Sequence, residues 1–168
     1  MPFLTLHKRL ITLFLIGLLS LVPLAVSASE IGQRDVFTIT KITDGDSLRA
    51  GDIRIRLHGI DAPEIKQLCS HKGPYPCGRQ SHQFLVDMLG SGAELICDHL
   101  DTDRYGRLVM RCYHRGLDIA AAMVRSGWAL AYRRYASDYI ADEADAKRYK
   151  RGMWAGEFQT PEAWRRAQ

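Results

Sequence analysis

The sequence predicts a small α+β domain in which short strands precede and follow one helix and further helices come after them. Segments rich in β-branched and aromatic residues recur at short intervals, separated by glycine, proline or aspartate. A stretch with helical spacing interrupts these segments once, and other such stretches follow the last of them. The 168 residues are enough for one domain with a substantial core.

The first 28 residues are expected to be a secretory signal peptide rather than part of this domain. A basic region, Lys8-Arg9, precedes an apolar run over residues 10–24, and small residues stand at the cleavage positions of Val26-Ser27-Ala28. An uncleaved membrane anchor is the alternative, but the run is short for a membrane span and contains Pro23. We therefore expect an exported protein, periplasmic or extracellular, that consists of residues 29–168 and makes no stable membrane association.

The net charge is only weakly basic. Removal of Lys8 and Arg9 with the signal peptide lowers the formal charge from +4 to +2. This balance permits binding to nucleic acid but does not demonstrate it.

Three strands are expected in close succession at the start of the domain. Residues 36–42 are rich in β-formers, and residues 47–50 follow the turn Asp44-Gly45-Asp46. Residues 53–60 then alternate between apolar and polar side chains, which is typical of a strand with one buried face. The alternating positions are Ile53, Ile55 and Leu57 against Arg54, Arg56 and His58.

A helix is expected over residues 79–89, with Phe84, Leu85 and Met88 on its buried face and Gly90-Ser91-Gly92 at its end. Residues 94–97 and 107–113 have the composition of a fourth and a fifth strand. A polar connection that turns near Arg104-Tyr105 joins them.

The remainder of the chain is expected to be mainly helical. Asp118 is a candidate N-cap for a short helix through Arg125, and residues 128–132 form an extended apolar segment. A mostly charged helix is expected over residues 137–150. In the C-terminal tail, which we expect to lie back on the domain, three aromatic residues stand out: Trp154, Phe158 and Trp164.

Four cysteines suit an oxidising compartment and allow three pairings. Cys97 and Cys112 lie symmetrically about the turn near residue 105, so we expect them to face each other across a hairpin. Cys69 and Cys77 would then close the loop between them. Zinc binding is the alternative, but the chain contains no Cys-x-x-Cys motif.

The stretch from residue 44 to residue 64 carries most of the chemistry. Two acidic turns stand at either end of the expected strand 53–60, and arginines lie between them. Carboxylate oxygens are the ligands of hard cations, and guanidinium groups bind phosphate. Each turn alone is more typical of an ordinary hairpin or of a strand end followed by a loop, but the combination predicts a cation site beside a phosphate site. The four acidic residues are Asp44, Asp46, Asp61 and Glu64.

These motifs resemble the staphylococcal nuclease-like family, the thermonucleases. The matching elements are Asp44-Gly45-Asp46-Ser47, Arg56, Asp61-Ala62-Pro63-Glu64 and Tyr105-Gly106-Arg107. The resemblance covers about residues 36–154 and implies a five-stranded OB-fold β-barrel with about three helices. The order of the expected strands and helices is that of such a barrel, although periodicity alone supports only a small α+β domain.

The resemblance also implies a Ca²⁺ ion bound by Asp46, Asp61 and the backbone carbonyl of Ala62. Relatives often have threonine at position 62, and alanine keeps that carbonyl. Ser47 stands in place of threonine in the first motif and keeps the hydroxyl. For Asp44 two interpretations stay open, a second carboxylate near the metal or only the start of the turn.

Catalytic roles follow from the same resemblance. It implies that Glu64 orients or deprotonates the attacking water and that Arg56 and Arg107 hold the phosphate. The expected reaction is hydrolysis of DNA and RNA to 3′-phosphate and 5′-hydroxyl ends with little sequence specificity. Positions that line the nucleotide site in the family correspond to Arg104, Tyr105 and Tyr132.

The alternatives are a non-catalytic OB-fold module that binds nucleic acid or protein and a disulfide-stapled interaction protein with a vestigial site. Modules of this kind are expected to lack the acidic and arginine residues that this chain keeps together. A monomer is the default expectation for the oligomeric state.

Overall fold

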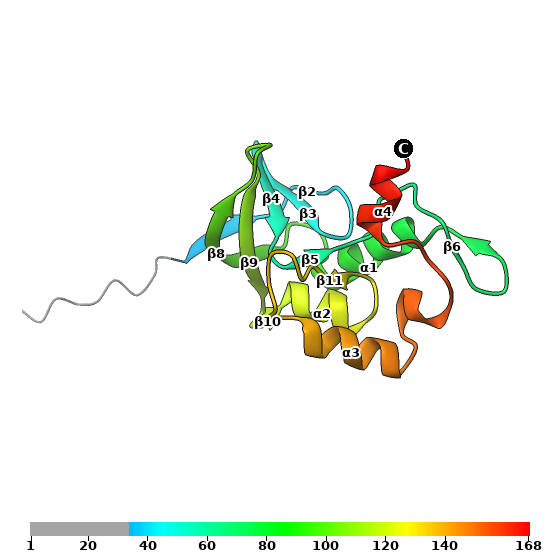
Figure 1. Cartoon of the computed structure of the whole chain (residues 1–168). Helices are drawn as coiled ribbons and strands as arrows, with labels where there is room; N and C mark the ends of the chain where they lie inside the picture. The colour runs from blue at the N-terminus through cyan, green and yellow to red at the C-terminus, as the bar shows by residue number, and fades with distance from the viewer. Residues whose placement is uncertain (1–33) are drawn as a thin grey trace, which may run out of the picture. The chain divides into compact units, whose positions relative to one another are not determined.

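The computed structural model describes residues 34–168. The expected signal peptide and its cleavage site lie outside the described residues. The main element is a seven-stranded sheet with the order β1-β8-β9-β4-β3-β2, in which β10 pairs with β9 (Figure 1). Its strands are β1 (Asp35–Thr38), β2 (Lys41–Ile42), β3 (Ser47–Ala50), β4 (Ile53–Leu57), β8 (Glu94–Thr102), β9 (Leu108–His114) and β10 (Leu117–Asp118).

The two edge strands of the sheet, β1 and β2, are consecutive in the chain, so the sheet must curl to bring its edges together. Only Ile39 and Thr40 separate β1 from β2. The Ile39 N–H donates to the carbonyl of Ala93 beside β8, whereas the Thr40 N–H donates to the carbonyl of Arg49 in β3, each at 2.8 Å. The chain therefore passes from one edge of the sheet to the other within two residues. The expected OB-fold class is confirmed, and the strand expected over residues 36–42 is divided between the two edges.

The strand expected over residues 53–60 is also interrupted. β4 ends at Leu57, and the chain resumes as β5 (Ile60–Asp61), which pairs with β11 (Leu130–Ala131) in a separate two-stranded sheet. Gly59 lies between β4 and β5 with a φ of 70°, a conformation that favours glycine. The break redirects Asp61 away from the main sheet.

β4 and β9 pair in parallel, with Ile55 opposite Leu108, whereas the other neighbours in the main sheet are antiparallel. β8 is longer than expected, since its polar second half continues to pair with β9 as far as Thr102.

The expected helices form, α2 with the expected ends, α1 with an earlier start and α3 shorter than expected, and one more helix follows them. The described residues include α1 (Cys77–Leu89), α2 (Ile119–Arg125), α3 (Ile140–Arg148), the 3₁₀ turn η1 (Gly152–Ala155) and α4 (Pro161–Arg166). The Asp118 carboxylate accepts the Ala121 N–H at 3.0 Å, as expected of an N-cap. α4 was not expected from the sequence. Across residues 34–168, every helix is too short or too polar to cross a lipid bilayer.

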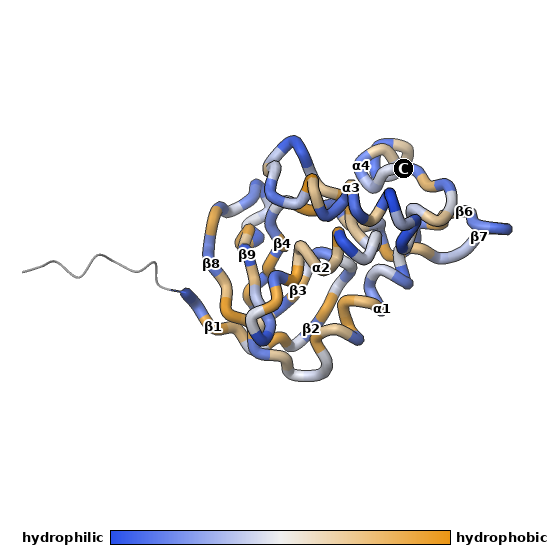
Figure 2. The backbone as a smooth tube through the Cα atoms, turned by 90° about the horizontal axis from the view of Figure 1, so that it is seen from below, coloured by the Kyte–Doolittle hydropathy of each residue, from blue (hydrophilic) through white to orange (hydrophobic). Residues whose placement is uncertain are grey.

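The core lies between the inner face of the curled sheet and the helices α1 and α2. Leu48, Ile55 and Leu57 from β3 and β4 are buried against Leu85 of α1 and Met123 of α2. Figure 2 shows hydrophobic stretches along the strands and α1, and a hydrophilic tip on the hairpin β6 (Cys69–Ser70) and β7 (Pro74–Tyr75).

Both expected disulfides are present. Cys97 and Cys112 are directly opposite each other in β8 and β9, and their bond is buried in the main core. The bond between Cys69 and Cys77 closes the β6–β7 hairpin onto the start of α1. This second bond lies in a smaller apolar cluster that also contains Met153.

Candidate active site

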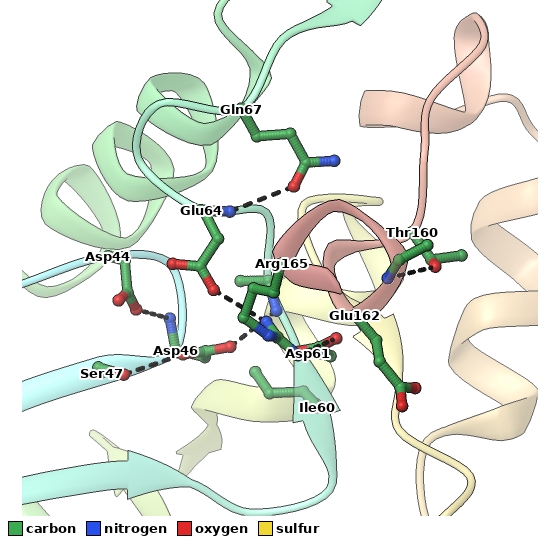
Figure 3. Close-up of polar contacts among 12 residues, drawn as sticks. Asp44, Asp46, Ser47, Ile60, Asp61, Glu64, Gln67, Thr160, Glu162 and Arg165 are labelled. Carbon is green, nitrogen blue, oxygen red and sulfur yellow. Dashed lines mark hydrogen bonds and ion pairs between the residues drawn. The ribbon is translucent and has the colours of Figure 1, made fainter. Parts of the chain in front are cut away.

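The two acidic turns lie against each other. The backbone N–H of Ala62 donates to Oδ2 of Asp46 at 2.7 Å, and this contact is buried. The Leu57 N–H donates to the carbonyl of Asp46 at 2.8 Å, so the first turn is also fixed to the end of β4. Within the first turn, the Asp46 N–H donates to Oδ1 of Asp44 at 3.1 Å (Figure 3). The two turns therefore form one acidic cluster.

Helix α1 supports both turns through close backbone approaches. A Cβ atom on Gly78 would overlap the carbonyl oxygen of Glu64. One on Gly45 would overlap the hydroxyl of Ser81 and lie 2.8 Å from Cβ of Ala62. The absence of side chains at these two glycines lets the helix start and the two turns meet.

Arg56 lies between the two turns. Its guanidinium forms an ion pair with Asp46 and donates to Oδ1 of Asp61 and to the carbonyl of Ile60, both at 3.1 Å. Its side chain is 15% exposed. Arg56 is therefore a largely buried cation whose charge is shared by the carboxylates of Asp46 and Asp61.

The pKa values of the three aspartates report this crowding. Burial alone would raise the pKa of Asp46, but the charge of Arg56 and several hydrogen bonds lower it. Burial and the negative charge of Asp46 raise the pKa of Asp44 to about 7. Burial also raises the pKa of Asp61; hydrogen bonds from Arg165 oppose that rise and the charge of Asp46 adds to it. The site therefore holds more carboxylates than Arg56 neutralises.

Glu64 extends from the second turn towards the C-terminal helix. Its Oε1 accepts a hydrogen bond from Arg165 of α4 at 2.8 Å, and its side chain is 33% exposed (Figure 3). Its backbone N–H donates to the side-chain carbonyl of the buried Gln67 at 3.3 Å. Glu64 thus has a fixed backbone and a carboxylate that solvent can reach.

Arg107 approaches the site from the turn that joins β8 to β9. Asp103 holds it, since its Nε donates to Asp103 Oδ2 at 2.7 Å and its backbone N–H donates to Oδ1 at 2.9 Å. Its Nη1 is 3.5 Å from the hydroxyl of Ser47, which in turn donates to Oδ1 of Asp46 at 3.0 Å. Arg107 therefore contacts the acidic turns through Ser47.

The expected nucleotide-contacting residues lie around the site rather than within it. Tyr105 is exposed at the hairpin tip, with the guanidinium groups of Arg104 and Arg107 4.8 and 5.7 Å from its ring centre. Tyr132 follows β11, and its N–H donates to the carbonyl of Gly59 at 2.8 Å. Burial and the nearby charge of Asp61 raise the pKa of Tyr132.

The donor set suits a hard cation by its chemistry. Asp46 and Asp61 are buried carboxylates beside the Ala62 backbone, and their mutual repulsion would be relieved by an added positive charge. In the part of the chain that the structure describes, however, no three acidic, histidine or cysteine side chains converge as a ready metal site. Arginine nitrogens contact the carboxylate oxygens instead.

Sequence reasoning missed Arg165, Gln67 and the supporting glycine Gly78. Thr160-Pro161-Glu162 is a helix-start signal, with threonine as N-cap and proline at the first helical position, and this signal would have sufficed to predict α4. No local pattern indicates that Arg165 would reach Asp61, a contact across 104 positions of the chain.

Comparison with known proteins identifies a matching family. Residues 54–156 match the family model described as staphylococcal nuclease homologue. This range includes Arg56, Asp61, Glu64 and Arg107, whereas Asp46 precedes it and Arg165 follows it.

Individual relatives match a similar part of the chain. The probable staphylococcal-like nuclease CAN3 of rice (Oryza sativa subsp. japonica) is 36% identical over 126 residues, which are 73% of this chain but 31% of the rice protein. An uncharacterized endonuclease of Escherichia coli O157:H7 is 32% identical over 70% of this chain and 75% of its own length. Another, from Haemophilus influenzae, is 30% identical over 80% of this chain and 75% of its own length. The chain thus spans about a third of the rice protein and three quarters of the two bacterial ones.

Proposed function

The chain belongs to the family of staphylococcal nuclease homologues, and on this premise we propose that it is a nuclease that hydrolyses phosphodiester bonds. We propose further that it depends on Ca²⁺, cleaves both DNA and RNA with little sequence specificity, and leaves 3′-phosphate and 5′-hydroxyl ends. One observation carries the proposal. Three carboxylates and three arginines, brought together by the two acidic turns, β4, the β8–β9 hairpin and α4, form one continuous polar cluster.

Asp46, Asp61 and the backbone carbonyl of Ala62 would hold the cation. When bound, Ca²⁺ would supply concentrated positive charge next to the phosphate oxygens. Asp46 is well suited to this role, because the pKa of its carboxyl group is lowered and the group stays ionised at neutral pH. Asp44, behind Asp46, is less suited to be a direct ligand, because the pKa of its carboxyl group is raised to about 7 and the group is only partly ionised at neutral pH.

Arg56 and Arg107 would bind the non-bridging oxygens of the phosphate. Both are anchored by carboxylates, Arg56 by Asp46 and Arg107 by Asp103, so that little conformational freedom is lost when they meet an anion. Stabilisation of the additional negative charge that develops on the phosphate is the expected contribution of such preorganised donors. Arg107, the more exposed of the two, would also assist departure of the leaving oxygen.

Glu64 would act as the general base. Its carboxylate is accessible to solvent, and its backbone is fixed through Gln67 and the close approach of Gly78. A carboxylate in this position can orient a water molecule and accept its proton. The structure supports this role by the accessibility of the group.

The substrate would lie across the β8–β9 hairpin and the segment after β11. Arg104 offers a cation to the backbone, and Tyr105 and Tyr132 offer rings for stacking or hydroxyls for hydrogen bonds. Contacts of this kind do not read base edges, which supports cleavage at many sequences. Export through the N-terminal signal peptide is part of the proposal, and the two disulfides support an oxidising compartment.

The proposal is tested by cleavage of end-labelled oligonucleotides with the purified, disulfide-bonded protein. Single-stranded DNA, duplex DNA and RNA are each incubated with Ca²⁺ or with excess chelator. We expect cleavage of all three with Ca²⁺, none with chelator, and product ends that a 3′-phosphatase converts to 3′-hydroxyls. A folded protein that cleaves none of them with any divalent cation would overturn the enzyme reading and favour a binding module.

A further inference from the structure

Helix α4 places a third arginine in the candidate active site. Nη1 and Nη2 of Arg165 lie 3.0 and 3.1 Å from Oδ1 of Asp61, and Nη2 is also 3.1 Å from Oδ2. Nη1 is in addition 2.8 Å from Oε1 of Glu64. Figure 3 shows the guanidinium between the two carboxylates. One side chain therefore bridges the proposed cation ligand and the proposed base.

The chain around α4 is built onto the same turn. Nε2 of the buried Gln67 donates to the carbonyl of Gln159 at 2.6 Å, while Oε1 of the same side chain accepts the Glu64 N–H. Pro161 is buried, and the Thr160 hydroxyl accepts the Ala163 N–H at 3.3 Å as an N-cap. The beginning of the helix is thus fixed against the second acidic turn. Arg165, in the last turn of the same helix, extends from there towards the site.

Both oxygens of Asp61 are occupied by guanidinium nitrogens. Oδ1 contacts Arg56 as well as Arg165, and Oδ2 contacts Arg165. A divalent cation on Asp61 would meet the positive charge of Arg165 at contact distance, and two cations repel each other strongly in a partly buried site. The Arg165 side chain is 36% exposed, so it can turn towards solvent without disturbing the curled sheet.

We propose that Arg165 is a positioning residue of the active site, an internal counter-cation that a divalent cation must displace from Asp61. The proposal rests on the cation site of the proposed function. Because the same guanidinium holds Glu64, its displacement also frees that carboxylate, and cation binding is coupled to release of the proposed base. Arg165 lies outside the part of the chain that matches the family model, which ends at residue 156.

The test is calorimetric titration of Ca²⁺ into the metal-free protein, its Arg165→Gln variant and a matched control. Removal of the competing charge is expected to tighten Ca²⁺ binding about tenfold, which corresponds to about 1.4 kcal/mol. Arg166→Gln removes the same charge from the same helix, but Arg166 pairs with Glu162. We expect this control to bind Ca²⁺ like the unchanged protein.

A second variant and a second observable distinguish the proposed role of Arg165 from misfolding of the Arg165→Gln variant. Arg165→Lys keeps the charge and loses the two-pronged contact, so an affinity between those of the unchanged protein and Arg165→Gln is expected. In the unchanged protein, the Nε–H NMR signal of Arg165, assigned by its loss in Arg165→Gln, should move as Ca²⁺ is added. Equal or weaker Ca²⁺ binding by Arg165→Gln, or a static Arg165 signal under saturating Ca²⁺, would overturn the proposal.

These readouts separate this proposal from the proposed function. Cleavage by the unchanged protein tests the nuclease assignment alone. The ratio of Ca²⁺ affinities between the variants tests Arg165 alone.

Discussion

Asp44 and Asp46 are separated by one residue, yet the pKa values of their carboxyl groups move in opposite directions. Burial acts on both, but Asp46 receives the ion pair with Arg56 and the N–H of Ala62, whereas Asp44 faces the charge of Asp46. The pKa of Asp44 reaches about 7 as a result. The identity of the partners, rather than that of the residue, therefore decides which carboxylate is suited to bind a cation.

Glu143 of α3 is a buried carboxylate outside the candidate site, and it connects α3 to β11. It accepts the N–H of Ala131 at 3.1 Å, and its other oxygen contacts Arg133 at 2.7 Å and Lys147 at 2.8 Å. Burial alone would raise the pKa of Glu143, but hydrogen bonds and charges from Arg133 and Lys147 lower it below its usual 4.5. Ala131 lies in β11, which pairs with the strand that carries Asp61.

Replacement of Glu143 by Gln is expected to lower the free energy of unfolding by about 2 kcal/mol near neutral pH. The reason is the loss of the charge-assisted hydrogen bonds that Glu143 makes with Arg133 and Lys147, whose side chains are about half exposed. A lowered pKa in the folded state means that the ionised group stabilises the fold above its unfolded pKa. That contribution is lost as pH falls through the lower, folded pKa. The difference between the two proteins should therefore be constant above pH 4.5 and shrink progressively as the pH falls from there through the folded pKa.

Urea unfolding of both proteins across this pH range checks the prediction. Glu94→Gln, an exposed substitution at the start of β8, serves as the control and should show no comparable difference. A difference that stays constant with pH would contradict the assignment of the stabilisation to the charge of Glu143.

At the scale of elements, the start of α1 determines where the two acidic turns lie. Gly78 and Ser81 are both buried at the point where the helix meets these turns, and the Ser81 hydroxyl also donates to the carbonyl of Trp128 at 2.7 Å. The Cys69–Cys77 disulfide joins the first residue of the helix to the chain just after the second turn. Helix, disulfide and turns therefore behave as one packed unit.

Replacement of Gly78 by Ala is expected to push the Glu64 turn away from α1. Overpacking of this kind costs about 1–3 kcal/mol of stability, and a shift of about 1 Å in a catalytic group can cost about 10²-fold in rate. We therefore expect kcat for oligonucleotide cleavage to fall by about 10²-fold in protein that is still folded at the assay temperature.

Gly116→Asn provides the matched control. Gly116 has a φ of 80° and no atom within 4 Å of an added Cβ, and asparagine tolerates this conformation. This variant should cleave at the unchanged rate. Unchanged kcat in Gly78→Ala would show that the close approach does not control the position of Glu64.

The elements that the sequence predicted best were those with a strong local signal. Asp118 begins α2 as an N-cap, and alternation along β4 correctly indicated that Ile55 and Leu57 are buried. Ile53 belongs to the same pattern but is 42% exposed, since it lies at the outer end of the strand. The division of residues 36–42 between two sheet edges was not predictable, because it depends on pairing with β8 and β3 rather than on local composition.

For the molecule as a whole, the curled sheet explains how a few short motifs become a site. The first turn leads into β3, the second begins at the last residue of β5, and Arg107 comes from the turn between β8 and β9. Three separate segments therefore converge at the site. Local spacing predicted the acidic turns and Arg56, and the family resemblance predicted the barrel and Arg107. Arg165 was not predicted, because its role depends on how the C-terminal segment packs on Gln67.

The central claim is that Glu64 activates water for phosphodiester cleavage at the two acidic turns, and Glu64→Gln tests it most directly. Glutamine keeps the size of the side chain and can still accept a hydrogen bond from Arg165, but it cannot accept the proton of a water molecule. Cleavage and equilibrium binding of a labelled single-stranded DNA are measured on the same protein in the presence of Ca²⁺.

We predict that kcat of Glu64→Gln falls by about 10²–10⁴-fold, the usual contribution of a general base, while the Kd for DNA changes by less than about threefold. Such a split would assign Glu64 to the chemical step. Cleavage at the unchanged rate by Glu64→Gln would contradict the account and would place the activity at another site.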